Sequence, residues 1–328
     1  MSALTDQFPT SLQPAASPTA PGQPEAPWHP PLGNPGGPQY WRAVDAAYGQ
    51  LVGEQRARDP HPWLLLQTVA TGPLRRSVYP VLGMRPGARV LDAGTGFGPV
   101  AVELAGAFGC RVIGVDTDGA QLKLASSVTD NLRAAGWLRP AHASDAATVS
   151  LATGSVGTLP FGDAVFDAVI ARFLLQHLED PVGAVTEMTR VTKPGGVVCI
   201  IDVDDGLCLS YPQPPEPLRL LEEAYQEAQR DRGGDRTIGR KIAGMLDAAG
   251  VAVVHVLVVP QAGYGQRRAA DEGQKLLHSR LSAVAGELVE RGLLDEATAA
   301  EGLHVLATQD IPAATVVDTH LAVIGRRR

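Results

Sequence analysis

The stretch Val90-Leu91-Asp92-Ala93-Gly94-Thr95-Gly96-Phe97-Gly98-Pro99 joins a short apolar strand signal to an apolar helical run that begins at Val100. Glycine accepts positive φ angles and, because it lacks a Cβ atom, lets a ligand approach the backbone closely. A helix that follows such a turn directs its first N–H groups at whatever the turn holds, and Pro99 suits its first position. The stretch therefore predicts a strand, a glycine loop and a helix that together bind a cofactor.

The spacing of the glycines restricts which cofactor this is. A dinucleotide site needs G-x-G-x-x-G, but Pro99 occupies the place of the third glycine, and the lysine of a P-loop is missing. Asp92 stands at the strand end, where a carboxylate can hold an ammonium group. The next strand signal ends in Asp116, which can accept hydrogen bonds from both hydroxyls of a ribose. A nucleoside with an ammonium group fits better than a pyrophosphate, and nicotinamide-dependent reduction is disfavoured.

Four sequence blocks, in this order and spacing, resemble class I S-adenosylmethionine (SAM)-dependent methyltransferases. They are VLDAGTGFG, VIGVD, LPFGDAVFDAVIARFLLQHLEDP and KPGGVVCIIDVDD, which together span about residues 89–205. The resemblance implies an α/β, Rossmann-like fold with a seven-stranded sheet whose last strand is antiparallel. It also implies SAM as cofactor and methyl transfer to an O, N or C nucleophile of a small molecule, with secondary metabolism as the expected setting.

Most of the predicted cofactor contacts follow the first two strands. They are Asp92, Ala93, Gly94, Thr95, Gly96, Gly98, Asp116, Thr117 and Gln121. We expect Asp92 to hold the methionine ammonium group and Asp116 the ribose hydroxyls. The alternatives are a structural role for Asp92 and a helix N-cap for Asp116, although Asp118 can fill that role.

The segment 154–161, which precedes the fourth predicted strand, departs from the family. Many members read G-D-A-x-x-L-P-F, with the Asp near the adenine amino group, whereas Ser155 takes that place here. Its hydroxyl can still accept from the amine, and the backbone N–H of Val156 can meet the adenine ring. One contact is weakened, and the prediction of SAM is unchanged.

Four further residues are predicted near the methionine end of SAM. Arg172 ends a strand beside the expected sulfonium position, where it can bind the SAM carboxylate or an anionic substrate; the alternative is an ion pair with Glu179 or Asp180. Tyr48, Arg75 and Arg76 belong to helical segments that the resemblance places over the cofactor; the alternative is that Tyr48 packs and the arginines face solvent.

Two residues are candidates for acid–base chemistry. His177 can act as the general base because its pKa suits neutral pH, although histidines at this place often only pack under the cofactor. Asp204 can contact substrate or move a proton. With Asp202 and Asp205 it can also bind Mg²⁺, but these positions do not form a convincing cage, and we predict no metal.

The chain divides into a tail, an extension and a main domain. Residues 1–38 are Pro-rich and predicted to be disordered, and residues 39–84 form a helical extension or lid. Residues 85–328 form the SAM-binding domain, with substrate-covering insertions at about 206–250 and 260–315. Strands are expected at 89–92, 111–116, 148–153, 166–171, 197–202, 251–259 and 317–324, and helices at 100–108, 119–135, 181–192 and 218–232.

Composition limits the partners. The 328 residues carry a net charge of −7, which argues against nucleic acid and anionic membranes, because phosphate binding needs a basic surface. Three cysteines give no zinc or disulfide pattern, and no signal peptide or 18-residue apolar run is found. We expect a soluble, cytoplasmic protein with a small-molecule substrate, and leave a homodimer open. The alternative function is a SAM-binding relative that acts as a cyclase or pericyclase, or only as a binder.

Overall fold

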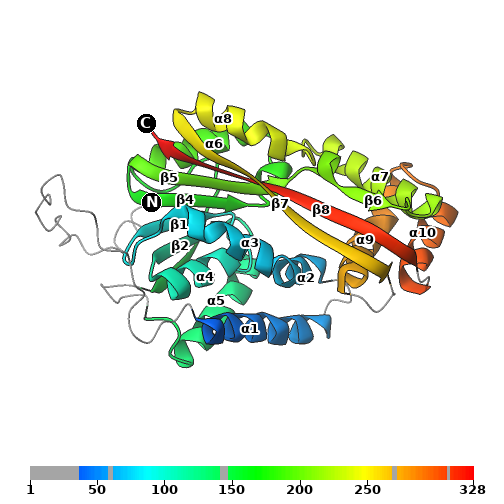
Figure 1. Ribbon diagram of the computed structural model, residues 1–328, viewed down its shortest axis with the longest axis horizontal. Coiled ribbons are helices and arrows are strands. Elements are labelled where there is room, and N and C mark those ends of the chain that lie inside the picture. The colour runs from blue at the N-terminus through cyan, green and yellow to red at the C-terminus, as the bar shows by residue number, and fades with distance from the viewer. Residues whose placement is uncertain (1–36, 58–61, 141–146, 268–271, 309–310) are drawn as a thin grey trace, which may run out of the picture.

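The computed structural model describes residues 37–57, 62–140, 147–267, 272–308 and 311–328, so the predicted tail lies almost entirely outside the described residues. The centre of the fold is one eight-stranded sheet. Seven of its strands follow the order β3-β2-β1-β4-β5-β8-β6, and the eighth, β7, pairs with the edge of β8 opposite β5 (Figure 1). The strands are β1 (Arg89–Ala93), β2 (Arg111–Asp116), β3 (Thr148–Thr153), β4 (Phe166–Arg172), β5 (Thr192–Val203), β6 (Leu209–Tyr211), β7 (Val251–Arg267) and β8 (Ile311–Arg327).

Strands β1 to β5 run parallel, whereas β8 runs antiparallel to β5, β6 and β7. Parallel strands are joined by helices, and their carboxyl ends therefore meet at one edge of the sheet, where open α/β sheets bind ligands. The predicted α/β fold with an antiparallel last strand is confirmed.

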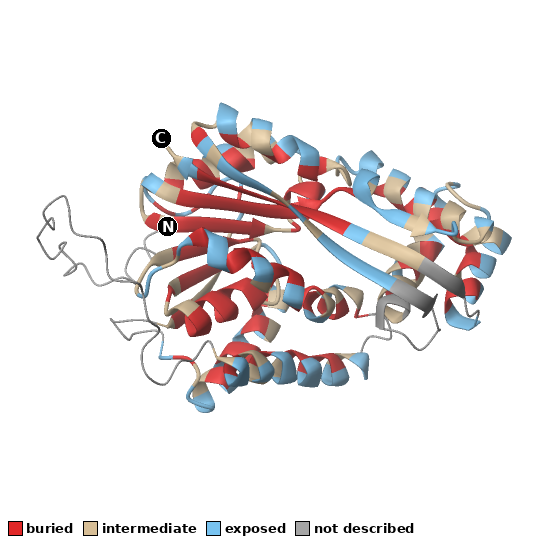
Figure 2. Ribbon diagram, viewed as in Figure 1, coloured by how far each residue is buried: buried red, intermediate tan, exposed pale blue. Residues whose placement is uncertain are grey.

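Helices cover both faces of the sheet. The helices are α1 (Pro38–Arg56), α2 (Trp63–Ala70), α3 (Gly72–Val78), α4 (Pro99–Phe108), α5 (Gly119–Ala134), α6 (Pro181–Val191), α7 (Glu216–Asp231), α8 (Ile242–Ala248), α9 (Glu272–Glu290) and α10 (Glu296–Thr308). One core joins the first face of the sheet to α1, α2, α4 and α5, and a second joins the other face to α6 and α8. Strands β1, β2 and β4 are buried along most of their length, as parallel strands covered on both faces should be (Figure 2).

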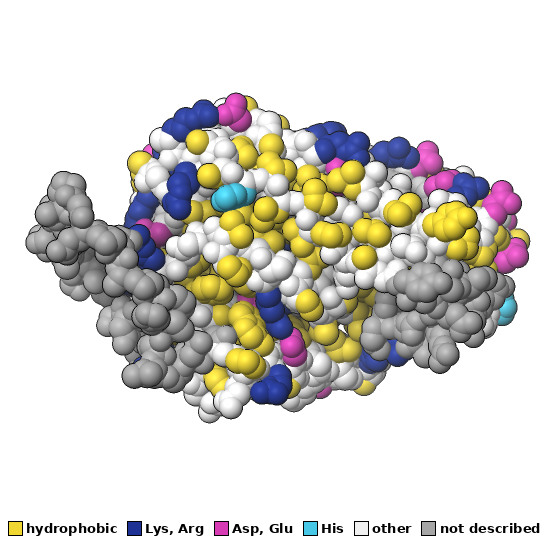
Figure 3. Space-filling view, viewed as in Figure 1, with side chains coloured by type: hydrophobic (Ala, Val, Ile, Leu, Met, Phe, Trp, Pro, Cys, Tyr) yellow, Lys and Arg dark blue, Asp and Glu magenta, His cyan; other side chains and the backbone are white. Residues whose placement is uncertain are grey.

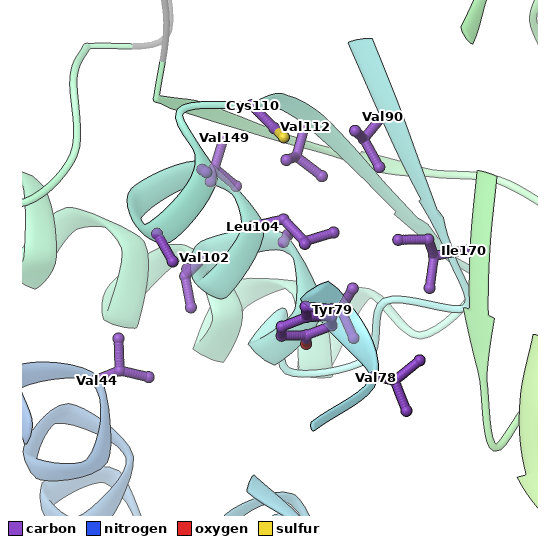
Figure 4. Close-up of a cluster of buried hydrophobic side chains, with 14 of the residues drawn as sticks. Val44, Val78, Tyr79, Val90, Val102, Leu104, Cys110, Val112, Val149 and Ile170 are labelled. Carbon is purple, nitrogen blue, oxygen red and sulfur yellow. The ribbon is translucent and has the colours of Figure 1, made fainter. Parts of the chain in front are cut away.

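The N-terminal extension is part of the first core. Helix α1 buries Tyr40, Val44, Tyr48 and Leu51, which recur at helical spacing on one face. Val44 lies near the side of α4 that carries Val102, while the sheet residues of the same cluster lie beyond α4 (Figure 4). The extension is therefore packed onto the sheet domain along its length.

Two differences from the predicted elements concern the last strands. The short strand β6 adds an eighth strand, because residues 209–211 of the predicted insertion pair with the extended β8. Strands β7 and β8 are each 17 residues long, well beyond the predicted apolar runs. Pro260, Gly263 and Gly265 interrupt the apolar pattern in β7, but β8 supplies backbone partners there.

Strand β7 forms an edge of the sheet. Val254, Val256 and Val258 are exposed on it, and Figure 3 shows apolar side chains over the region of β7. Helices α7, α9 and α10 of the two insertions form a third apolar cluster at the far end of β7 and β8 (Figure 1). None of the helices in the described ranges is both long and apolar enough to cross a bilayer.

Candidate active site

The glycine loop lies at the carboxyl end of β1 and requires its glycines. Gly94, Gly96 and Gly98 have φ angles of 73°, 54° and 77°, in the left-handed region that favours glycine. The N–H groups of Gly94 and Thr95 donate to the carbonyl of Val115 on β2, at 2.8 and 3.0 Å. A Cβ atom on Gly94 would lie 2.8 Å from Leu174 Cδ1, so both the turn and its surroundings exclude a side chain there.

Asp92 is a buried acid at the base of this loop. Its Oδ2 accepts a hydrogen bond of 2.5 Å from the Thr95 hydroxyl, and the residue is only 1% exposed. Burial is the main reason why its pKa rises to about 7; nearby Asp116 raises it further, while Thr95 and Arg172 lower it. A ligand ammonium group beside Asp92 would favour its charged form, which fits the predicted role.

Asp116, at the end of β2, faces the same loop. Its carboxylate accepts from the N–H groups of Gly96, at 2.8 Å, and Asp118, at 2.9 Å. Asp118 is the N-cap of α5 and accepts from Ala120 and Gln121, so capping does not explain Asp116. Two backbone donors hold the carboxylate in place and leave lone pairs for other donors.

Other predicted contacts surround these two acids. Ala93 is fully buried, Thr117 is exposed, and Gln121 Nε2 donates to Asp118. The Gly154 N–H donates to the Asp116 carbonyl at 3.0 Å. This hydrogen bond brings the segment 154–161 beside Asp116.

In the segment 154–161, Ser155 is exposed and Val156 is buried. The Ser155 Oγ accepts from the Gly157 N–H at 3.2 Å. Its predicted contact with adenine, like the other cofactor contacts, stays a prediction.

The two lid residues have partners of their own. The Tyr48 hydroxyl donates to the carbonyl of Phe97, inside the glycine loop, at 2.9 Å. Arg76 forms ion pairs with Asp45 and Glu103, at 2.6 and 2.9 Å. Tyr48 thus supports the loop from outside, and Arg76 joins α3 to α1 and α4; neither side chain is shown to point at a ligand.

Arg172 differs from the other arginines of the site. It donates to the Thr71 hydroxyl at the junction of α2 and α3, and its guanidinium carbon lies 3.9 Å from the Phe173 ring centroid. Its Nε is buried with no partner among the described residues, and the alternative ion pairs with Glu179 or Asp180 do not form. Burial, followed by repulsion from Arg75, lowers the pKa of Arg172 to about 9.

His177 borders a cavity beneath the insertions. The cavity has a volume of about 170 Å³ and is lined by Trp63, His177, Tyr225, Ala228, Gln229, Arg232, Gly234, Val284 and Leu288. His177 Nδ1 lies 3.5 Å from Gln229 Nε2. His177 is exposed, but desolvation of its ring by the surrounding residues, and then the charge of Arg236, lower its pKa to about 4, so the imidazole is neutral near pH 7.

Asp204 is placed differently from the expectation. It is fully buried, pairs with Arg240 at 2.5 Å and accepts from the Gly206 N–H at 3.2 Å. These donors occupy both carboxylate oxygens, so the environment is that of a structural ion pair. Acid–base work by Asp204 stays a prediction that its partners do not favour. Among the described residues, no His, Cys, Asp or Glu cluster suited to a metal ion occurs.

His320 was missed by sequence reasoning. It lies in β8, opposite Val203 of β5, is 8% exposed, and its ring lies 4.8 Å from that of Phe173. No motif surrounds it in the sequence. Only the antiparallel register of the last strand brings it to the carboxyl end of β4 and β5.

Residues 91–200 match the family model of the methyltransferase domain. An uncharacterised methyltransferase of Schizosaccharomyces pombe is 32% identical over 59% of this chain and 65% of its own length. The O-methyltransferase rstn1 of Aspergillus nomiae is also 32% identical, over 51% of this chain and 68% of its own. A putative methyltransferase of Bacillus halodurans, of known structure, has a TM-score of 0.49 and 18% identity, covering 77% of this chain and 97% of that one.

The sheet is parallel with an antiparallel last strand, a glycine loop follows β1, and an acid follows β2. The family model and the Aspergillus relative show that the chain belongs to the class I SAM-dependent methyltransferases. The chain spans about two thirds of the length of the two relatives named, 65% and 68%.

Proposed function

We propose that the protein transfers a methyl group from SAM to an O, N or C nucleophile of a small molecule in secondary metabolism. The observation that carries this proposal is the pair of acids, Asp92 and Asp116, on either side of a loop that can hold only glycine at Gly94. Hydrogen bonds of 2.5 Å from Thr95 and 2.8 Å from Gly96 fix the two carboxylates. One acid would hold an ammonium group and the other the ribose hydroxyls, and SAM carries both.

Arg172, which can bind either the SAM carboxylate or an anionic acceptor, supports this proposal as well. Arg172 presents a buried Nε without a partner in the described part of the chain, at the strand end next to Asp92. Asp92 and Ile170 are register partners on β1 and β4, so Arg172 lies two residues beyond that pair. When bound, SAM supplies an electrophilic methyl group on a positively charged sulfur.

The protein's own contribution would be orientation and exclusion of water. Methyl transfer is an in-line displacement, for which holding the two reactants at the right distance is the largest source of acceleration. Helices α2 and α3 cover the carboxyl ends of the strands and are tied to Arg172 through Thr71.

The test is formation of S-adenosylhomocysteine (SAH) from SAM with a panel of phenols, quinols, amines and carbon acids. We expect SAH to appear with at least one acceptor class, together with a product heavier by one methyl group. Tight binding of SAM with no SAH from any class would contradict methyl transfer and support the alternative, a SAM-binding relative with another activity.

A further inference from the structure

Two buried polar atoms near the end of β4 have no hydrogen-bond partner among the described residues. They are His320 Nδ1 and Arg172 Nε. His320 is only 8% exposed, so water does not replace the missing partner freely. Leaving a buried polar group without a hydrogen bond is costly, so native proteins keep few of them, and a catalytic role or a bound water or ion can account for each.

The sheet register brings both residues to the same face. Arg172 pairs with Ile201 of β5, which pairs with Ala322 of β8. His320 lies two residues before Ala322 and pairs with Val203. Because side chains alternate along a strand, Arg172 and His320 point to the face that α2 and α3 cover.

Phe173 holds the two groups together. Its ring centroid lies 3.9 Å from the Arg172 guanidinium carbon and 4.8 Å from the His320 ring. The backbone of Phe173 has a φ angle of 52°, uncommon for a non-glycine residue, and its N–H donates to the Ile201 carbonyl at 2.8 Å. Such a local conformation, kept in place by the sheet, is typical of functional sites.

The charges at this point are unbalanced. Arg236, whose charge also acts on His320, is neutralised by Asp205 through hydrogen bonds of 2.7 and 2.8 Å. In the described ranges Arg172 has no such ion pair, only the hydroxyl of Thr71 and the Phe173 ring. Asp92 attracts it from a distance but pairs with Thr95 instead. An oxygen with developing negative charge would meet an uncompensated cation here.

We propose that Arg172 and His320 bind an acidic hydroxyl group of the acceptor, which is a phenol or an enol. His320 is the general base for O-methylation of this hydroxyl group. This inference rests on the proposed function and names its substrate class. The hydroxyl proton passes to His320 Nδ1 as the O–CH₃ bond forms and the S–CH₃ bond of SAM breaks. The donor leaves as a neutral thioether, and Arg172 stabilises the oxygen as the proton departs.

The state of His320 agrees with this role. Burial, and then the charges of Arg172 and Arg236, lower its pKa to about 4, so the imidazole is neutral near pH 7 and one ring nitrogen can accept a hydrogen bond. A phenolate bound at Arg172 would offset that charge and make the imidazole more basic at the moment of transfer.

The probe for this proposal is 4-nitrophenol, whose phenolate absorbs visible light, added to protein saturated with SAH. At a pH where the free phenol is mainly protonated, we expect wild-type protein to bind it and produce the phenolate signal. His320→Asn keeps a hydrogen-bonding group near the place of Nδ1 but cannot take up a proton. It should reduce the signal at least tenfold while changing the affinity for the probe less than threefold.

Arg172→Met should weaken the probe's binding itself by tenfold or more. His255→Asn, on exposed β7, is the matched control and should behave as wild type. Thermal unfolding and SAH titration of each variant show whether it is folded; if His320→Asn is not, His320→Gln replaces it.

The outcomes separate the two proposals. Wild-type protein that binds SAH but gives no phenolate signal would overturn the acidic-hydroxyl site alone. A signal that survives in His320→Asn would exclude His320 as the base. Protein that does not bind SAH would instead overturn the proposed function.

Discussion

Arg75 of α3 and Glu103 of α4 form a buried ion pair with two hydrogen bonds, Nε to Oε2 at 2.8 Å and Nη2 to Oε1 at 2.9 Å. Both side chains are at most 2% exposed, and the Tyr79 hydroxyl donates to the same carboxylate at 2.6 Å. Glu103 lies in the helix that follows the glycine loop. The pair therefore joins α3 to α4, the helix that begins at the glycine loop.

Breaking this pair should strongly destabilise the protein. Glu103→Leu leaves the Arg75 guanidinium buried without its partner, which we expect to lower the free energy of unfolding by about 3–5 kcal/mol. Urea denaturation followed by circular dichroism measures this. Asp45, the exposed partner of Arg76, is the control. Asp45→Asn should lower the free energy of unfolding by at most about 1 kcal/mol. Equal losses in the two variants would contradict a structural role for the pair.

The stability of the ligand-free protein should depend on Asp92. Its pKa is raised from 3.8 to about 7, mainly by burial. A raised carboxyl pKa contributes stability that is fully present below pH 3.8 and is lost as the pH rises towards about 7. Asp202, whose pKa rises to about 6, adds to the same slope.

Asp92→Asn should therefore be less sensitive than wild type to a change from pH 5 to pH 8, as measured by thermal unfolding. Asp202→Asn serves as the comparison, because it removes only the other contribution. An unchanged pH profile in Asp92→Asn would show that Asp92 is charged throughout.

The glycine loop should not tolerate a methyl group. Gly94→Ala combines a φ angle of 73° with a contact of 2.8 Å to Leu174 Cδ1, and we expect it to lose both stability and SAH affinity. Gly83→Ala is the matched control, since its φ is 64° and nothing lies within 4 Å of the added atom. Gly83→Ala should lower the free energy of unfolding by only about 1–2 kcal/mol, because the backbone there is left-handed. The variant should keep its affinity for SAH. Equal effects on affinity would show that Gly94 does not line the cofactor site.

How much of this site the sequence predicted depends on how local each feature is. Asp92, Gly94 and Asp116 sit next to strand ends that apolar runs identify, so their placement could be predicted and the structure brings them together. The Arg75–Glu103 pair could not, because opposite charges 28 residues apart have no pattern that distinguishes them from exposed ones.

His320 was missed for a related reason. Its place depends on the register between β5 and β8, which joins residues more than one hundred positions apart. Arg76 was predicted near the cofactor from the family resemblance, which stays a prediction, and the structure shows its ion pairs with Glu103 and Asp45. Side-chain partners across helices are decided by packing, which a single sequence does not display.

The central claim is that Asp116 and the glycine loop bind the ribose of SAM. Calorimetric titration of SAM and SAH into wild-type and Asp116→Ala protein tests it most directly, with Asp118→Asn, which keeps the helix cap, as control. We predict micromolar binding to wild type and to the control, and a loss of tenfold or more, about 1.4 kcal/mol, in Asp116→Ala. Absence of binding to wild type, or equal binding to Asp116→Ala, would contradict the account.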